Sequence, residues 1–165
     1  MKEVADEIKH DTDRLDMLVN NSGIGILTPQ KTDYGVDRHM AVNHVGHVVL
    51  TTHLLPLLFE TARDGTTVRI SQQASNAHQG APKDTQFASL DEINSDAGPN
   101  GQYGRSKLAN ILFARYIDRT VTKNGHPNVL MNATHPGVVS TKQSVADIHE
   151  PYVLPTRGDN LPFAC

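Results

Sequence analysis

The stretch Asp16-Met-Leu-Val-Asn-Asn-Ser-Gly23 decides the fold. Its first half is a short apolar run that is typical of a buried strand, and its second half, from Asn20, is a polar turn that ends this strand. Upstream, Val4, Ile8 and Leu15 are apolar residues in a charged background, which predicts the end of an exposed amphipathic helix. The chain is therefore expected to open with a helix that is followed by a strand.

Two further helix–strand pairs follow along the chain. Apolar residues at spacings of three and four predict a second helix over Tyr34–Phe59 and a third over Gln102–Lys123. Short strands are predicted from Val68 onward and over Asn128–Asn132, and residues 76–101, rich in Gly and Pro, are predicted to be a surface loop. Strands separated by long helices favour parallel pairing through right-handed crossovers. The sequence thus predicts an open α/β fold that is built on a parallel sheet.

Composition excludes several classes of protein. The chain has 165 residues, which suits one domain, and we expect this domain over residues 1–147 with an irregular tail over 148–165. A formal net charge of −3, without a cluster of Lys and Arg, gives no electrostatic reason to expect nucleic-acid binding. The only cysteine, Cys165, cannot form an intrachain disulfide, and the N-terminus is charged where a signal peptide would be apolar. We therefore expect a cytoplasmic protein.

Neither a membrane segment nor a metal site is expected. The most apolar stretch, Val42–Phe59, is interrupted by three histidines and Pro56, and on this basis we predict that it is too polar to span a bilayer. His44 and His47 lie close in sequence but lack an accompanying Cys or Glu signature. The histidines are therefore expected to be exposed or packing residues rather than metal ligands.

Polar residues follow each predicted strand. In a parallel α/β sheet, ligands bind outside the carboxyl ends of the strands, so the turns after the strands are candidate sites. These turns are Asn20–Gly23, Ala74–Asn76 and Pro136–Thr141. On the third predicted helix, Tyr103 and Lys107 are four residues apart and share one face.

These motifs, in this order, resemble those of the short-chain dehydrogenase/reductase family, and specifically of its fungal and retinol-dehydrogenase-like branch. The turn Asn20–Gly23 is similar to the family's Asn-Asn-Ala-Gly turn, Ala74-Ser75 to its Ser-Ser pair, and Tyr103–Lys107 to its Tyr-x-x-Ser-Lys motif. Asn43 matches the helix asparagine of the family's catalytic tetrad. Pro136–Thr141 is similar to the segment at the nicotinamide end of the cofactor.

The resemblance covers most of residues 3–145 and implies a partial Rossmann-like sheet with flanking helices, from the family's fourth strand to its sixth. It also implies NAD(P)-dependent hydride transfer on a carbonyl or secondary alcohol. The implied catalytic residues are Ser75, which would bond the substrate oxygen, Tyr103, which would exchange the proton, Lys107, which would lower the pKa of Tyr103, and Asn43, which would hold a relay water. A cation close to a phenol favours the phenolate, which suits such a pair.

The cofactor contacts that the resemblance implies are Asn20, Tyr103, Lys107, Val139 and Thr141. The implied cofactor is NADP, with NAD as the alternative, and the implied substrate is a small, apolar carbonyl compound or alcohol of secondary metabolism. The family's dimers use the faces of the helices predicted at Tyr34–Phe59 and Gln102–Lys123, so the resemblance also implies a homo-oligomer.

Each of these residues has a plainer interpretation as well. Tyr103 and Lys107 could be an aromatic and a cation on a solvated helix face, Ser75 a turn residue, and Asn43 an ordinary polar residue of a helix. The printed sequence also contains no Thr-Gly-x-x-x-Gly-x-Gly turn, which in the family cradles the cofactor pyrophosphate at a helix N-terminus. A strand meant to be central would then have an unpaired edge. The alternative function is therefore a truncated, non-catalytic remnant that binds no dinucleotide.

Overall fold

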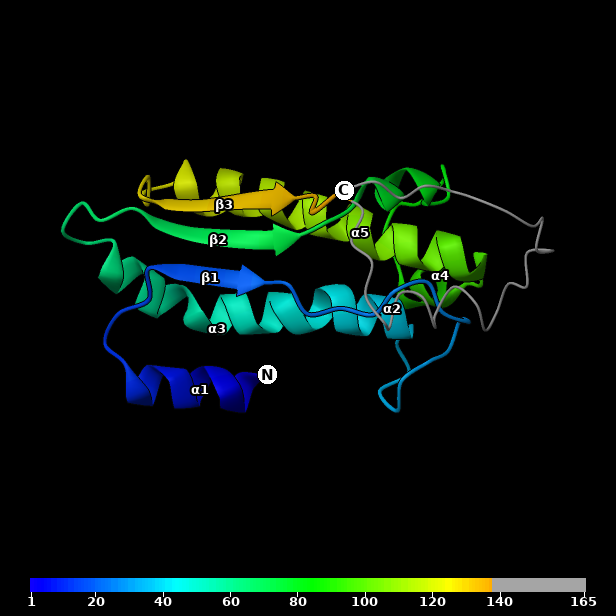
Figure 1. The fold of residues 1–165 in the computed structure, drawn as a ribbon, viewed down its shortest axis with the longest axis horizontal. Helices are drawn as coiled ribbons and strands as arrows, with labels where there is room; N and C mark the ends of the chain where they lie inside the picture. Colours follow the sequence, from blue (N-terminus) through cyan, green and yellow to red (C-terminus); the bar gives the residue numbers. More distant parts are fainter. Residues whose placement is uncertain (138–165) are drawn as a thin grey trace, which may run out of the picture.

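A three-stranded parallel sheet forms the centre of the fold (Figure 1). The computed structural model describes residues 1–137, so the predicted boundary at residue 147 and the predicted tail lie outside them. The strands pair in the order β1-β2-β3, with bounds β1 (Met17–Asn20), β2 (Val68–Gln73) and β3 (Val129–Thr134). The predicted α/β class with parallel strands is confirmed.

Long helices connect the strands and cover one face of the sheet. The helices outside the loop segment are α1 (Lys2–Asp11), α2 (Arg38–Met40), the π-turn η1 (Ala41–Val45), α3 (Gly46–Thr61), α5 (Gly98–Ile117) and its extension η3 (Asp118–Thr122). Figure 1 shows α3 and α5 together behind the sheet. Two successive crossovers of the same hand, in a sheet whose strand order follows the chain, place both helices on the same face.

The second helical segment begins at Arg38 rather than at Tyr34. The carboxylate of Asp37 accepts a hydrogen bond from the backbone N–H of Met40 at 2.8 Å and so caps the helix. Tyr34 lies in the turn before this cap. Further along, the segment widens into the π-turn η1, which contains the buried Asn43.

Two short helices lie in the segment that the sequence predicts to be a loop. They are η2 (Asn76–Gly80) and α4 (Leu90–Asn94), and each follows a serine, Ser75 or Ser89, whose hydroxyl accepts a hydrogen bond from a backbone N–H of the first turn. In addition, α5 already begins at Gly98. The loop prediction is wrong for these residues because side-chain caps stabilise single helical turns without any apolar periodicity.

The core lies between the sheet and the two long helices. Leu54 and Leu58 of α3 pack with Ile70 of β2 and Ile117 of α5, and all four side chains are buried. Removing this apolar surface from water stabilises the fold by about 25 cal/mol for each Å². The predicted apolar face of the second helix is therefore confirmed at its C-terminal half.

The buried face of α5 differs from the apolar stripe that its spacing predicts at Leu108, Ile111, Leu112 and Tyr116. Leu112 and Tyr116 are exposed, whereas Phe113 and Ile117 face the core. The same buried face also carries Asn110, which is fully buried. A polar residue on the buried face hides that face from a search for apolar periodicity.

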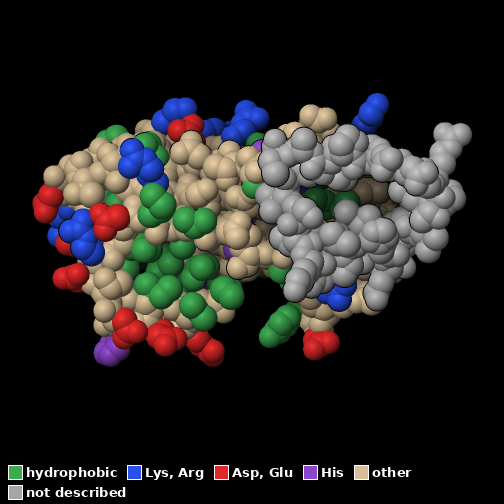
Figure 2. Space-filling model, viewed as in Figure 1, with side chains coloured by type: hydrophobic (Ala, Val, Ile, Leu, Met, Phe, Trp, Pro, Cys, Tyr) green, Lys and Arg blue, Asp and Glu red, His purple; other side chains and the backbone are tan. Residues whose placement is uncertain are grey.

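The other face of the sheet is uncovered within residues 1–137. There β1 pairs only with β2, and Met17 and Val19 of β1 point outward and are 59% and 56% exposed. Figure 2 shows hydrophobic side chains gathered on this side of the molecule, between β1 and α1. The outer edge of β1, a strand with exposed apolar side chains, is therefore open to pairing with another strand.

One helix, Arg38–Thr61, is long and apolar enough to cross a membrane, judged by length and composition. The segment is therefore less polar than the sequence-based prediction assumes. A core helix of a soluble protein meets the same criteria, and here Leu54, Leu57 and Leu58 pack in the core. A single helix of this type is weak evidence for a membrane segment.

Candidate active site

The predicted motifs meet at one edge of the sheet, the edge formed by the carboxyl ends of the strands. β1 ends at Asn20, and β2 ends at Gln73, two residues before Ser75. The first half of α5 carries Tyr103 and Lys107, and the Lys107 side chain reaches the end of β2. The elements of the fold thus bring together residues that are far apart in the sequence.

Ser75, Tyr103 and Lys107 lie close to one another at this edge. Lys107 Nζ donates a hydrogen bond to the Gln73 carbonyl at 3.1 Å and lies 5.5 Å from the centroid of the Tyr103 ring. The Ser75 hydroxyl accepts a hydrogen bond from the backbone N–H of Ala77 at 3.1 Å and lies near enough to the Tyr103 side chain to lower the pKa of this phenol. Ser75 is therefore a turn residue that also lies beside Tyr103.

Burial controls the proton affinities of the two titratable groups. Burial raises the pKa of Tyr103, and the hydrogen bond with Ser75 opposes this with a smaller effect. Burial lowers the pKa of Lys107 to about 8, because a charged ammonium is disfavoured away from water. Lys107 faces the ring of Tyr103, and the predicted lowering of the Tyr103 pKa by Lys107 is not found in this structure.

Asn43 is fully buried and ties the chain after β1 to α5. Its Oδ1 accepts a hydrogen bond from the backbone N–H of Ile24 at 2.8 Å, and its Nδ2 donates to the Ile24 carbonyl at 3.1 Å and to Ser106 Oγ at 3.0 Å. Both amide hydrogens are thus engaged within the protein. The Asn43 carbonyl accepts a hydrogen bond from Asn110 at 2.9 Å, and the predicted role of Asn43 in holding a relay water stays a prediction.

The side chain of Asn20 points into the protein. Its Nδ2 donates to Thr51 Oγ1 at 2.8 Å and to Gln72 Oε1 at 2.9 Å. Gln72 Nε2 lies 3.1 Å from His47 Nδ1, so the buried glutamine of β2 has partners at both ends of its amide. The contact of Asn20 with a cofactor ribose stays a prediction, and Asn20 Oδ1 is a buried atom without a partner among the described residues.

Two other predictions reach beyond the described chain. Val139 and Thr141, the predicted contacts of the cofactor carboxamide, lie outside the described residues. Within residues 1–137, no group of three or more His, Cys, Asp or Glu side chains is arranged to hold a metal ion. The expectation that the chain holds no metal stays a prediction.

Three residues to which the sequence analysis assigned no role shape the site. Ser106 Oγ donates to the Tyr103 carbonyl at 2.7 Å, and Gly104 lets α5 lie directly against η2. Asn110 is fully buried, and its side chain donates hydrogen bonds to the backbone carbonyls of Asn43 in η1 and Gln73 in β2. Its position, three residues after Lys107 and seven after Tyr103, places it on the same helix face, so spacing is the signal that points to it.

The arrangement fits one end of a dinucleotide cofactor. An ammonium group carries three N–H donors, and Lys107 uses one of them within the described residues, so two are available to ribose hydroxyls. Tyr103 is only partly buried and its hydroxyl has a neighbour in Ser75. Because the printed sequence contains no Gly-rich turn, the fit concerns the nicotinamide–ribose end and not the pyrophosphate.

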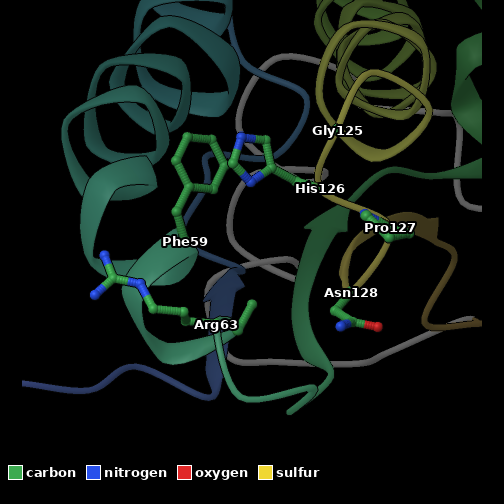
Figure 3. Close-up of a pocket in the computed structure, with 7 residues that line it drawn as sticks. Phe59, Arg63, Gly125, His126, Pro127 and Asn128 are labelled. Atoms are coloured by element: carbon green, nitrogen blue, oxygen red, sulfur yellow. The ribbon is translucent and has the colours of Figure 1, made fainter.

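A separate cavity of about 300 Å³ lies at the opposite end of the sheet (Figure 3). There Phe59 of α3 stacks on His126, with ring centroids 3.8 Å apart and planes at 8°. Asn128, which lines the same cavity, directly precedes β3. The cavity is thus at the end where the strands begin, and none of the predicted site residues lines it.

A parallel sheet covered by long helices, with a serine, a tyrosine and a lysine side by side at its carboxyl edge, defines a Rossmann-like protein of the oxidoreductase type. The family model described as short chain dehydrogenase matches residues 1–88, more than half of the chain. The chain belongs to the short-chain dehydrogenase/reductase family.

Named relatives agree with this assignment. The chain is 70% identical over 155 residues to a Neurospora crassa protein named as the mitochondrial oxidoreductase bli-4, covering 92% of the chain and 38% of that protein. It is 37% identical over 150 residues to human retinol dehydrogenase 14, covering 90% of the chain and 41% of that protein. It is 33% identical over 129 residues to human polyprenol dehydrogenase, covering 77% and 37%. The chain therefore spans about two fifths of the length of these relatives.

Solved structures share the fold. A Mycobacterium paratuberculosis protein superposes with a TM-score of 0.64 at 28% identity, covering 98% of the chain and 57% of that protein. The Pseudomonas aeruginosa RhlG/NADP complex superposes with a TM-score of 0.63 at 22% identity, covering 91% and 53%. The second likeness supports the fold alone.

Proposed function

We propose that the chain is part of an NAD(P)-dependent dehydrogenase or reductase that moves a hydride between a nicotinamide ring and a carbonyl or secondary-alcohol carbon. The observation that carries this proposal is the meeting of Ser75, Tyr103 and Lys107 at the carboxyl edge of β2 in a chain of this family. When bound, the cofactor supplies or accepts the hydride. The proton at the substrate oxygen must then come from or go to the protein.

Tyr103 is the residue proposed to move this proton. Burial keeps its pKa high, so the phenol is neutral and suited to donate a proton to the oxygen of a carbonyl being reduced. Ser75, which lies beside Tyr103, would donate a second hydrogen bond to the same oxygen. Lys107, whose pKa of about 8 keeps it mostly charged at neutral pH, would bind the ribose and stabilise the phenolate that forms.

The proposed substrate is an apolar alcohol or the corresponding carbonyl compound. Two relatives are named as polyprenol and retinol dehydrogenases, and polyprenols and retinol are apolar alcohols. We propose NADP as the cofactor and NAD as the alternative, and a place in secondary metabolism stays a prediction. The cytoplasm is likewise a prediction from the sequence, whereas the Neurospora relative is named as mitochondrial.

Replacing the proposed proton donor tests the mechanism. In the purified chain, Tyr103→Phe should lower the rate of NADPH oxidation with an apolar aldehyde by roughly 100-fold or more, since a positioned acid commonly contributes that much. Tyr116→Phe is the matched control, because Tyr116 lies exposed on the same helix. Unchanged turnover in the Tyr103 variant would contradict the assigned role.

Cofactor binding separates this proposal from the rival one, a non-catalytic remnant. Calorimetric titration of the chain with NADPH and then with NADH should give a heat of binding, and Lys107→Met should weaken it because the ribose loses its donors. No heat with either cofactor at millimolar concentration would favour the remnant.

A further inference from the structure

Asn110 joins three elements of the fold beside Lys107. Its Nδ2 donates a hydrogen bond to the Asn43 carbonyl in η1 at 2.9 Å and another to the Gln73 carbonyl at the end of β2 at 2.9 Å. Its Oδ1 lies 2.9 Å from His44 Nδ1. Asn110 is fully buried, so each of these bonds is made away from water, where losing a partner is costly.

The Gln73 carbonyl is an acceptor that Asn110 shares with Lys107. Lys107 Nζ donates to the same oxygen at 3.1 Å, and this is its one hydrogen bond within residues 1–137. A carbonyl oxygen has two lone pairs, so the ammonium and the Asn110 amide together fill its capacity. The amide therefore fixes where the Gln73 carbonyl points, and with it the place of the ammonium that bonds to this oxygen.

His44 fixes the orientation of the Asn110 amide. Because Nδ2 donates twice to carbonyls, Oδ1 must be the acceptor toward His44, and His44 Nδ1 must carry the hydrogen. Burial lowers the pKa of His44, so the neutral ring with hydrogen on Nδ1 makes this bond at neutral pH. The ring itself is held edge-on against Phe113, with centroids 5.9 Å apart and planes at 90°.

We propose that Asn110 is a positioning residue for the proton-transfer site: its amide, oriented by His44, holds the Gln73 carbonyl so that the Lys107 ammonium stays beside the Tyr103 ring. The benefit to hydride transfer rests on the proposed function, since it concerns the same Tyr103 and Lys107. The effect on Lys107 itself does not need a cofactor and is measurable in the chain alone.

The titratable neighbours of Lys107 are the same in every variant that tests this proposal. The titratable groups that face it are Tyr103 on α5 and His47 on α3, whose pKa burial lowers and the Lys107 charge lowers further. Neither residue contacts Asn110 through a hydrogen bond within the described chain. A change in the titration of Lys107 then reports on the Gln73 carbonyl.

The test is the NMR titration of the Lys107 side chain in the purified protein, with Asn110→Leu as the variant. Leucine has the branched shape of asparagine but cannot donate to the Gln73 carbonyl, so the ammonium loses the fixed acceptor that favours its charged form. The titration midpoint of Lys107 should fall by about one pH unit. Asn100→Leu is the matched control, because Asn100 is an exposed asparagine of the same helix, and it should leave the midpoint unchanged.

A folded Asn110→Leu protein in which Lys107 titrates as in the parent chain would overturn the proposal, because a merely structural asparagine lowers stability without moving that midpoint. If Asn110→Leu does not fold, His44→Phe decides instead. Phenylalanine keeps the edge-on packing against Phe113 but removes the donor that orients the amide, so the Lys107 midpoint should fall by a smaller amount. An unchanged midpoint in that folded variant would equally overturn the proposal.

Turnover data distinguish this proposal from the proposed function. In a catalytically active chain, Asn110→Leu should lower kcat at least several-fold while KM for the carbonyl substrate changes little, because the amide does not face the substrate. A chain without any turnover refutes the proposed function, and the Lys107 titration then still decides the role of Asn110.

Discussion

Gly104 of α5 lies directly against the backbone of Ala77 in η2. A Cβ at Gly104 would be 2.7 Å from the Ala77 carbonyl oxygen, 2.7 Å from the backbone nitrogen of Ala81 and 2.8 Å from the carbonyl carbon of Gly80. These are backbone atoms of one short helix and of its C-terminal cap, so none can move aside alone. The contact therefore sets how closely Ser75, which caps η2, approaches the side chains on α5.

Gly104→Ala should push η2 away from α5. We expect a loss of about 1–3 kcal/mol in the free energy of unfolding, as for other overpacked sites, and a lower rate of any turnover because Ser75 moves. Chemical denaturation checks the first effect. Gly46→Ala is the control: its Cβ would meet the nearest atom at 3.5 Å, so stability should be unchanged or slightly higher. Equal losses in both variants would contradict this reading of the contact.

Lys107→Met should stabilise the chain at neutral pH, and the gain should shrink as the pH rises. The pKa of Lys107 is about 8 in the folded chain against an ordinary 10.5, so between these values the unfolded chain binds more protons and stability rises with pH. The destabilisation by the buried charge is complete below pH 8 and disappears toward pH 10.5. It amounts to about 3 kcal/mol at most.

Urea denaturation of the parent chain and the variant across this pH range measures the difference. Lys123→Met is the control, because Lys123 is exposed and bonded to Asp118, and it should show no such trend. A constant difference between Lys107→Met and the parent chain at all pH values would show that the charge of Lys107 is not buried at a cost.

The carboxylate of Glu92 in α4 holds the preceding loop in place through hydrogen bonds. It accepts hydrogen bonds from the backbone N–H groups of Gln86, Phe87 and Ala88 at 2.6, 2.9 and 2.8 Å, and these bonds lower its pKa. A carboxyl group with a lowered pKa stabilises the folded loop above its ordinary value of 4.5 and loses this effect as the pH falls through the folded value. The loop should therefore loosen in acid.

Glu92→Gln should loosen the same loop at neutral pH, because a neutral amide is a weaker acceptor for three donors. Amide hydrogen exchange at residues 86–88 should accelerate by roughly tenfold. Asp91→Asn changes a neighbouring carboxylate without these bonds and should leave exchange unaltered. Identical exchange in Glu92→Gln and the parent chain would show that the Glu92 carboxylate does not hold this loop in place.

The exposed apolar residues on α5 predict self-association. Leu112 and Tyr116 are exposed on this helix, which is one of the two helices that the family resemblance assigns to a homo-oligomer. Leu112→Glu should lower the association constant at least tenfold, because it places a charge in an apolar contact. Sedimentation equilibrium measures this, with Leu90→Glu, at an exposed leucine of α4, as the control. A parent chain that is monomeric at all concentrations would refute the predicted oligomer.

The order of helices and strands could be predicted from the sequence, and so could the meeting of Tyr103 and Lys107 with Ser75. The period of apolar residues defines the long helices, and the turns after the strands must share one edge in a parallel sheet. The residues at which the helices begin were harder to predict. The second helical segment begins at Arg38 because of the Asp37 cap, a contact of one side chain rather than a pattern.

The buried polar residues could not be predicted from apolar patterning. Gln72 sits in the centre of the sheet because Asn20 and His47 satisfy its amide, and Asn110 is buried because two carbonyls and His44 surround it. Each depends on partners that are distant in the sequence. The proton affinities of Tyr103 and Lys107 also depend on burial, which reverses the expected direction for the phenol.

The order of the strands in the sheet, β1-β2-β3, is also their order in the chain. Each new strand can therefore add to the edge left by the one before it, with its own helix already made, and none has to wait for a later segment. A nascent chain leaving the ribosome can assemble this sheet one helix–strand unit at a time. The last strand to pair is β3, which lies along β2 from Val129 beside Val68 onward. This pairing completes the sheet at whose edge Ser75 lies.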